Sequence, residues 1–177
     1  MNDWQQTERK IAFEHPWIRI IIDTLTRGDV SKPYIYLESP VDAVATVALT
    51  ADGQIVLARQ YRHPVGQIIT DLPAGRANPA EPPLEAARRE LEEETGYRPA
   101  TLVVLGRASP FPGSLKVTMH LFFATDLAPG QQHLDEGEEL EVLLRPFDEV
   151  YDEVIHSKHI DAALQWGVLL ARARGLA

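Results

Sequence analysis

The sequence predicts an α/β (α+β) fold, a sandwich in which helices cover a mixed β-sheet, and two observations support this prediction. Short runs rich in β-branched residues, separated by turn signals, stand before and after one long helical segment in the middle of the chain. Two more helical segments follow the last of these runs. This order is typical of helices packed on one sheet, and 177 residues suffice for a single domain with a proper core.

The N-terminal strands, at about residues 13–40, are expected to form a β-hairpin. Trp17 to Leu25 is rich in β-branched residues, and Tyr34 to Leu37 is a second short strand. Arg27-Gly28-Asp29 supplies a turn signal between the two strands. Residues 1–12 are polar, and we expect them to be loosely attached.

The core of the domain is expected at about residues 41–177. Val41 to Thr50 and Gln54 to Tyr61 are apolar and flank a turn at Ala51-Asp52-Gly53, which predicts a hairpin at the centre of the sheet. Three further strands and two helices are then expected, in the order Thr101 to Ala108, Val117 to Asp126, Leu140 to Leu144, helix Phe147 to Ile155 and helix Ile160 to Arg174.

The composition argues against several classes of protein. The formal net charge of −9 disfavours a nucleic-acid backbone as the main partner, although a bound metal ion reverses the local sign for a small anion. No apolar run approaches membrane-spanning length, and the first ten residues lack the apolar core of a signal peptide. There is no cysteine, which is compatible with a reducing compartment. We therefore expect a cytoplasmic protein without nucleic-acid or membrane partners.

The segment from Pro82 to Thr95 is predicted to be a helix. Prolines at its start suit a first turn, where the missing N–H has no partner in any case, and Gly96 is a stop signal. Leu84, Ala87 and Leu91 recur at three- and four-residue spacing, which predicts the face that packs on the core.

Three glutamates of this helix carry the first functional prediction. Glu90, Glu93 and Glu94 fall at i, i+3 and i+4, so their carboxylates are expected to converge on one patch. Carboxylates held this close raise one another's pKa unless a cation lies among them, and ligands that are all oxygen suit Mg2+ or Mn2+. For three glutamates alone, a solvated acidic helix face is the simpler interpretation.

A longer pattern favours the metal site. The fixed positions are Gly75, then Glu81 after five residues, Arg89-Glu90-Leu91 after seven more, Glu93-Glu94 after one and Gly96 after one. This pattern resembles the Nudix box, and it departs only at Tyr97, where the family usually has an aliphatic residue. The resemblance covers roughly residues 41–172 and implies the Nudix-like α/β/α sandwich, with the acidic helix packed on the sheet.

The resemblance also implies roles for residues in and before the helix. Glu90, Glu93, Glu94 and the backbone carbonyl of Ala74 become the ligands of Mg2+, with Mn2+ as an alternative. Arg89 orients the helix carboxylates by ion pairing. Glu93 and Glu94 are thereby counted among the catalytic residues.

A glutamate in the acidic loop before the strand at Leu140 is implied as the base that activates water, or as an extra metal ligand. Glu138 is our choice, and Glu139 is the alternate. For either residue alone, a solvated acidic loop is nearly as good an interpretation.

Three residues are candidates for binding the substrate. Arg62 lies in a segment that resembles one found before the box in ADP-ribose and sugar-nucleotide pyrophosphatases, and its guanidinium suits a phosphate; a local ion pair is the alternative. Pro112, sixteen residues beyond Gly96, resembles a marker of the ADP-ribose pyrophosphatase subfamily, although Pro110 is close to the same register. Arg27 is the third candidate.

The resemblance implies Mg2+-dependent hydrolysis of the pyrophosphate bond in a nucleoside diphosphate derivative. ADP-ribose, split into AMP and ribose 5-phosphate, is the expected substrate. A pyrophosphatase for another nucleotide sugar such as GDP-mannose is the alternative, as is a Nudix-like module that binds a nucleotide without cleaving it. Similar enzymes pair through their N-terminal strands, which implies a homodimer.

Overall fold

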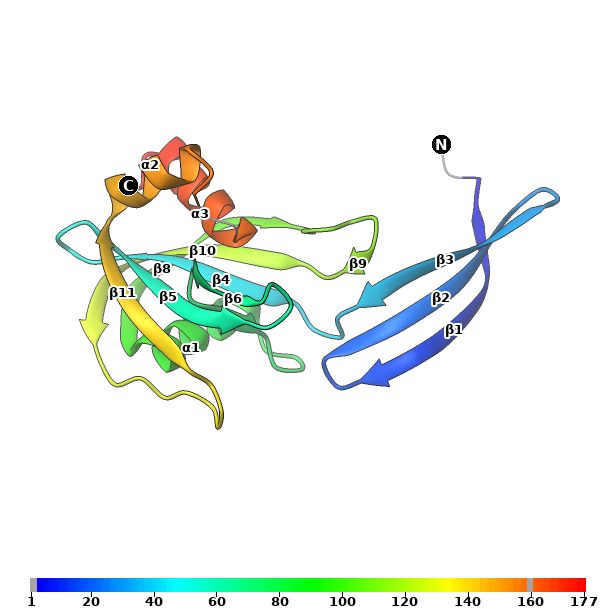
Figure 1. Cartoon of the computed structure of the whole chain (residues 1–177), viewed down its shortest axis with the longest axis horizontal. Coiled ribbons are helices and arrows are strands. Elements are labelled where there is room, and N and C mark those ends of the chain that lie inside the picture. Colours follow the sequence, from blue (N-terminus) through cyan, green and yellow to red (C-terminus); the bar gives the residue numbers. More distant parts are fainter. Residues whose placement is uncertain (1–2, 159–160) are drawn as a thin grey trace. The chain divides into compact units, whose positions relative to one another are not determined.

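The computed structural model describes residues 3–158 and 161–177 of the chain (Figure 1). These residues divide into two compact units. Unit 1 runs up to Asp42 and also includes Ala108–Met119, whereas unit 2 comprises Ala43–Arg107 and His120–Ala177. Within the described part of the chain, no helix combines the length and the apolar character needed to cross a membrane.

Unit 1 is a four-stranded sheet with the order β1-β2-β3-β9. Its first three strands are antiparallel, and β9 pairs with β3 in parallel. The expectation of a loosely attached N-terminus is wrong for the described residues, because β1 pairs with β2 from Gln5 to His15. The strands of this unit are β1 Gln5–His15, β2 Ile18–Arg27, β3 Val30–Glu38 and β9 Leu115–Lys116.

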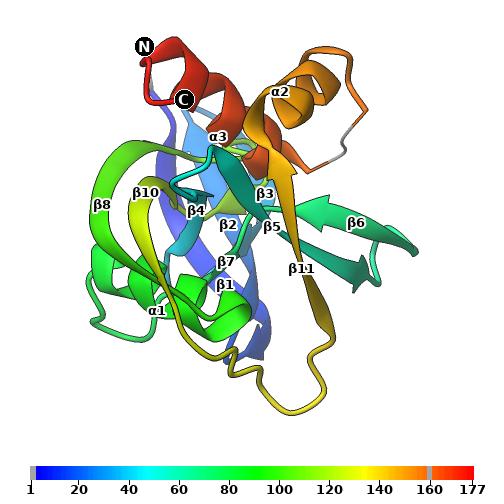
Figure 2. The ribbon, with the colours of Figure 1, turned by 90° about the vertical axis from the view of Figure 1, so that its left-hand side faces the viewer.

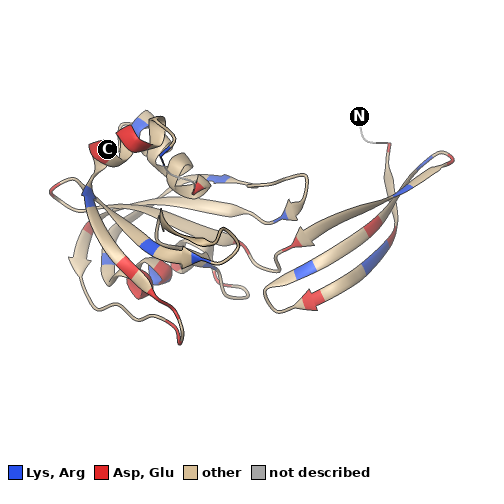
Figure 3. Cartoon of the chain, viewed as in Figure 1, with Lys and Arg blue, Asp and Glu red and all other residues tan. Residues whose placement is uncertain are grey.

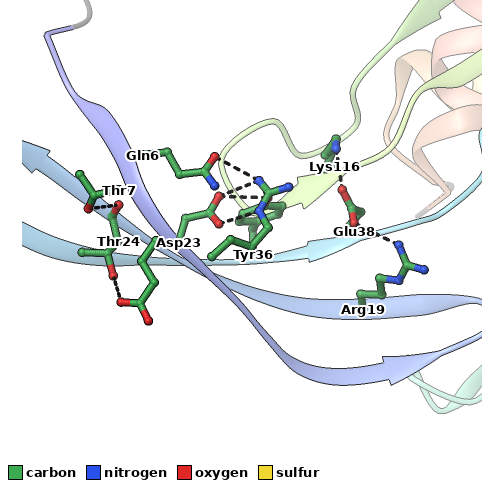
Figure 4. Close-up of polar contacts among 10 residues, drawn as sticks. Gln6, Thr7, Arg19, Asp23, Thr24, Tyr36, Glu38 and Lys116 are labelled. Atoms are coloured by element: carbon green, nitrogen blue, oxygen red, sulfur yellow. Dashed lines mark hydrogen bonds and ion pairs between the residues drawn. The ribbon is translucent and has the colours of Figure 1, made fainter.

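Two groups of charged side chains hold unit 1 together (Figure 4). The buried carboxylate of Asp23 accepts hydrogen bonds from Nε and Nη2 of Arg9, each at 2.9 Å, and another from the Tyr36 hydroxyl at 3.2 Å. The bonds from Arg9 lower the pKa of Asp23. Lys116 donates to Glu38 at 2.5 Å, so β9 is tied to β3 by an ion pair as well as by the backbone. These contacts attach β1 and β9 to the unit, although neither strand is apolar.

Unit 2 is a sandwich, in which a seven-stranded sheet has α1 on one face and α2 and α3 on the other (Figure 2). The sheet has the order β11-β5-β4-β10-β8, with β6 paired to β5 and β7 paired to β4. This architecture confirms the predicted sandwich. The elements are β4 Ala43–Leu49, β5 Gln54–Arg62, β6 Gln67–Asp71, β7 Ala74–Arg76, α1 Pro83–Thr95, β8 Tyr97–Ala108, β10 Met119–Pro129, β11 Leu140–Pro146, α2 Phe147–Ile155 and α3 Ala162–Ala173.

Most of the predicted elements of unit 2 are present within a few residues of their expected bounds. The helix Phe147–Ile155 and the start of β11 at Leu140 are as predicted. β8 begins at Tyr97, four residues before the expected strand, directly after the helix stop at Gly96. Ile160, the expected first residue of the last helix, lies outside the described residues.

Both faces of β4 are covered, which explains why it is a continuous apolar run. Val44 and Ala48 pack in the clusters that contain the buried face of α1. Val47 points the other way, toward α3, where a Cβ on Gly167 would lie 2.8 Å from the Val47 side chain. Glycine at this position therefore lets α3 lie close to the sheet.

The central sheet opens into a fork between β4 and β5. The two strands pair only at Ala48↔Val56 and Leu49↔Ile55, beside their turn. Beyond that point β5 pairs with β6 and β4 pairs with β7. The segment between β6 and β7 therefore crosses the fork, with Asp71 at the end of β6 and Ala74 at the start of β7. This arrangement places the predicted entry to the acidic helix at the opening of the sheet.

Candidate active site

The helix α1 is fixed at both ends and along one face. Pro82 is its N-cap, and Gly96 ends it in the left-handed conformation with φ of 76°, which favours glycine. Of the predicted apolar stripe, Ala87 and Leu91 are buried against the sheet and Leu84 is partly buried, and Ala86 is buried beside them. The opposite side of the helix is left to carry polar residues.

Two glutamates of α1 lie against the first residues of β7. The Glu94 carboxylate accepts a hydrogen bond from the backbone N–H of Ala74 at 2.8 Å. The Glu90 carboxyl lies so close to Gly75 that a Cβ built there would stand 2.1 Å from its Cδ. Gly75 is therefore needed because any side chain would occupy the place of the Glu90 carboxyl group.

Arg89 binds three glutamates at once. Its Nε and Nη2 donate to the two oxygens of Glu81 at 3.0 and 2.9 Å. Its Nη1 donates to Glu90 at 2.9 Å and to Glu93 at 2.8 Å. Glu81 also accepts from the backbone N–H of Asn78 at 2.7 Å. The predicted pairing of Arg89 with the helix carboxylates is thus present, and Glu81 ties the loop before the helix to the same guanidinium.

Burial makes two of the helix carboxylates resistant to ionisation. Burial, together with the charges of Glu90 and Asp71, raises the pKa of Glu94 to about 8 against the opposing effects of the Ala74 N–H and Arg62. Burial also raises the pKa of Glu90, although Arg89 opposes this shift. Such groups become stable anions when a positive charge is placed beside them, which is the environment that a metal ion supplies.

Glu90 and Glu93 share the Nη1 of Arg89, and the charge of Glu90 acts on Glu94, so the three carboxylates lie near one another, but they are not arranged as a metal-binding group. Among residues 3–158 and 161–177, no group of three or more His, Cys, Asp or Glu side chains is placed to hold a metal ion. The i, i+3, i+4 spacing sets the three Cα atoms on one side of α1, but each carboxylate takes a nearer donor: Arg89 for Glu90 and Glu93, and the Ala74 N–H for Glu94. The donors are nevertheless all oxygen, and Glu94 is buried, which fits Mg2+.

A pocket of about 660 Å3 lies beside Glu94 in unit 2. Its walls come from β5, from β6 and from the loop that leads into β11, which carries acidic side chains (Figure 3). Both candidate bases, Glu138 and Glu139, line this pocket together with Glu94. The structure therefore brings the helix glutamate and the loop glutamates to one cavity.

Two lining residues, Arg59 and Tyr61, were not among the sequence candidates. Arg59 pairs with Glu141 at 3.2 Å, and both side chains are about half exposed, so this pair is weak and Arg59 is available to an anion. The only available signal was that both residues lie on β5, the strand that carries the predicted Arg62. Arg59 and Tyr61 point to one face of this strand and Arg62 to the other, because side chains alternate along a strand.

Arg62 is held by an ion pair with a buried carboxylate. Its Nε and Nη2 both donate to Oδ2 of Asp71, at 3.2 and 2.6 Å. The local ion pair that the sequence left open is therefore present, and it does not prevent a phosphate contact by the rest of the guanidinium.

The other two substrate candidates lie in unit 1. Arg27 ends β2 and stands over the ring of Trp4, with its Cζ 4.8 Å from the ring centroid. Pro112 lines a pocket of unit 1 together with Tyr34 and Tyr36. Their roles in substrate binding stay predictions.

The chain is similar to proteins of one known family. The family model described as NUDIX domain matches residues 39–165. The chain is 35% identical over 144 residues to the ADP-ribose pyrophosphatase of Bacillus subtilis (strain 168), which covers 77% of each chain. It is 34% identical over 140 residues to the methanol dehydrogenase activator of Bacillus methanolicus, and the aligned region covers 78% of this chain and 75% of the relative. The fold is similar to the crystal structure of an ADP compounds hydrolase, with a TM-score of 0.88 and 23% identity over 100% of this chain and 97% of that one.

The match to the family model and the identity to these relatives show that the chain belongs to the Nudix family. It is a Nudix hydrolase, and the segment from Gly75 to Gly96 is its Nudix box.

Proposed function

We propose that this enzyme hydrolyses the pyrophosphate bond of ADP-ribose and releases AMP and ribose 5-phosphate, with Mg2+ as its metal and Mn2+ as a substitute. The observation that supports this most is the shared pocket, in which buried Glu94 faces two glutamates of the loop and an arginine of β5. The name of the Bacillus subtilis relative supports the choice of ADP-ribose.

The proposed metal ligands are Glu90, Glu93, Glu94 and the carbonyl of Ala74. When bound there, a divalent cation neutralises the charge of a diphosphate and lowers the pKa of a water molecule. The chain's own contribution is to hold these oxygens near one another: Gly75 leaves space for Glu90, and Arg89 restrains Glu90 and Glu93.

Glu138 is proposed as the base that takes the proton from the attacking water, with Glu139 as the alternate. Both line the pocket of Glu94. The charge of Glu138 contributes to the raised pKa of Glu90, which indicates that Glu138 lies within electrostatic reach of the helix carboxylates. This electrostatic proximity favours Glu138 over Glu139 as the base.

A substrate panel tests the proposed function. Purified enzyme is incubated with ADP-ribose, GDP-mannose, NADH and a diadenosine polyphosphate, with Mg2+ and Mn2+ in parallel, and products are separated by anion-exchange chromatography. AMP and ribose 5-phosphate from ADP-ribose are expected, and Glu138→Gln is expected to lower kcat about 100-fold or more while Glu139→Gln lowers it far less. Faster turnover of GDP-mannose would show that the enzyme is a pyrophosphatase for another nucleotide sugar. Binding without any product would identify a nucleotide-binding module.

We also propose that two chains pair through unit 1. Residues directly opposite each other in a sheet share a face, so the pairs Phe13↔Ile20, Ile20↔Leu37 and Ile22↔Ile35 place five apolar side chains together. Asp23 and its partners lie on the other face. An apolar face of this kind on a sheet is typical of an interaction surface. The cytoplasm as the place of action stays a prediction from composition.

A further inference from the structure

Asp71 is a buried carboxylate that the proposed chemistry leaves without a role. Its side chain is 3% exposed, whereas that of its partner Arg62 is 41% exposed. Oδ2 accepts from Nε and Nη2 of Arg62, and the Gln60 amide stands 3.4 Å from both carboxylate oxygens. The contacts of Arg62 with described residues therefore use one edge of the guanidinium and leave Nη1 for another ligand.

The strand register explains how Asp71 reaches these two side chains. Asp71 lies opposite Ala58, and Gln60 and Arg62 follow Ala58 at two-residue steps, so all four residues point to the same face of the β5–β6 ladder. Three residues after Asp71, the Ala74 N–H binds Glu94. The charges of Asp71 and Arg62 both act on Glu94, with opposite effects on its pKa. Asp71 is thus bonded to the arginine and lies within electrostatic reach of Glu94.

We propose that Asp71 is a positioning residue, which holds Arg62 beside the pocket of Glu94 so that its free Nη1 contacts a phosphate of the substrate. This inference rests on the proposed function. An arginine that is not restrained loses side-chain rotamer entropy when it binds a phosphate. The ion pair with a buried, immobile carboxylate restricts the side chain before the substrate arrives.

The acidic surroundings give a second reason for such a restraint. The pocket is lined by Glu94, by the glutamates at 138 and 139, and by Glu141. Arg62 does not itself line this pocket, but its charge acts on Glu94. We expect an unrestrained Arg62 to be drawn to these carboxylates, whereas Asp71 holds the guanidinium from the buried side.

A double-mutant cycle tests this role with Asp71→Ala, Arg62→Gln and the combination of both. For Asp71→Ala we expect KM for ADP-ribose to rise about tenfold, which is the effect of one charge-assisted hydrogen bond, with a smaller change in kcat. Binding of ADP-ribose in EDTA, measured by calorimetry, should weaken by the same factor. Because Asp71 acts through Arg62, the double variant should be no weaker than Arg62→Gln alone.

Two further variants separate positioning from a structural role. Asp71→Asn keeps an oxygen that accepts from Arg62, so it should retain binding within about threefold and also preserve the fold if Asp71→Ala does not. Glu153→Gln breaks a two-bond pair with Arg145 in the same unit, at 2.7 and 3.0 Å, and should leave KM unchanged. Losses that add in the double variant, or a wild-type KM in Asp71→Ala, would overturn the inference. If the wild type does not cleave ADP-ribose, the proposed function fails instead, and the cycle is run on the substrate that the panel identifies.

Discussion

At the scale of single residues, the absence of one Cβ at Gly75 decides where the Glu90 carboxyl group lies. Its φ is not positive, so alanine is compatible with the backbone there, and the nearest atoms that its Cβ would meet are those of the Glu90 carboxyl group, at 2.1 to 2.3 Å. We predict that Gly75→Ala lowers kcat/KM about 100-fold, as expected when a catalytic group is displaced by an ångström or so, with little change in Tm. Glu90 is flexible enough to move aside.

Gly113→Ala is the matched control for this change, because its Cβ would meet nothing within 4 Å and its φ is also not positive. Steady-state kinetics and thermal melts of both variants make the comparison. Equal activity of Gly75→Ala and wild type would show that the position of Glu90 on β7 is not needed.

Glu94 predicts a pH dependence of stability in metal-free buffer. Its folded pKa of about 8 lies above the ordinary 4.5, so the folded protein binds a proton that the unfolded chain has released between these values. The contribution of this group to the free energy of unfolding is therefore full below about pH 4.5 and falls as pH rises toward about 8. Glu94→Gln has no such titration.

We expect Glu94→Gln to gain stability relative to wild type when the pH is raised from 5 to 8.5 in EDTA. Urea titrations at both pH values measure this difference, and comparing the two proteins cancels the other titrating groups. A difference that is the same at both pH values would contradict the raised pKa. Added Mg2+ should reduce the gap at pH 8.5, because a cation stabilises the ionised carboxylate only in the wild type.

Sequence spacing could predict the contacts within α1 but not those between strands. Arg89 and Glu93 are four residues apart on a helix, so their pairing follows from helical geometry. Arg62 and Asp71 are brought together by the register of β5 with β6, and a pattern of residues does not contain that register. For this reason the role of Asp71 became visible only in the structure.

At the scale of elements, α1 was predictable because several signals agree. The prolines at its start, the apolar stripe and Gly96 all indicate the same helix, and the structure has it from Pro83 to Thr95. β1 gave no such signal. All of its residues are exposed, so there is no buried face to produce an alternation of apolar and polar side chains.

The short strands β6, β7 and β9 were hidden for a different reason. Each completes the hydrogen bonding of a longer strand: β6 and β7 fill the fork between β5 and β4, and β9 extends β3. Strands of two to five residues carry too few side chains to show a period. Their position depends on the strands that they pair with, and β6 and β7 place Asp71 and Ala74 at the site.

At the scale of the whole molecule, the charge of the enzyme sets a problem for its proposed substrate. A net charge of −9 and an acidic pocket repel a diphosphate. Arg59 and Arg62 supply two positive charges near Glu94, and the proposed metal supplies the rest. The acidic residues thus favour binding of the cation, and the cation and the two arginines then attract the negatively charged substrate.

The apolar face of unit 1 leads to a prediction about assembly. Ile35 is 61% exposed and lies on that face, opposite Ile22. We predict that the wild type sediments as a dimer at micromolar concentration and that Ile35→Lys sediments as a monomer, because a lysine ammonium in the centre of an apolar interface loses its hydration without gaining a partner. Val104→Lys is the matched control, since Val104 is 63% exposed on β8 in unit 2. A monomeric wild type would refute pairing, and a dimeric Ile35→Lys would place the interface on another surface.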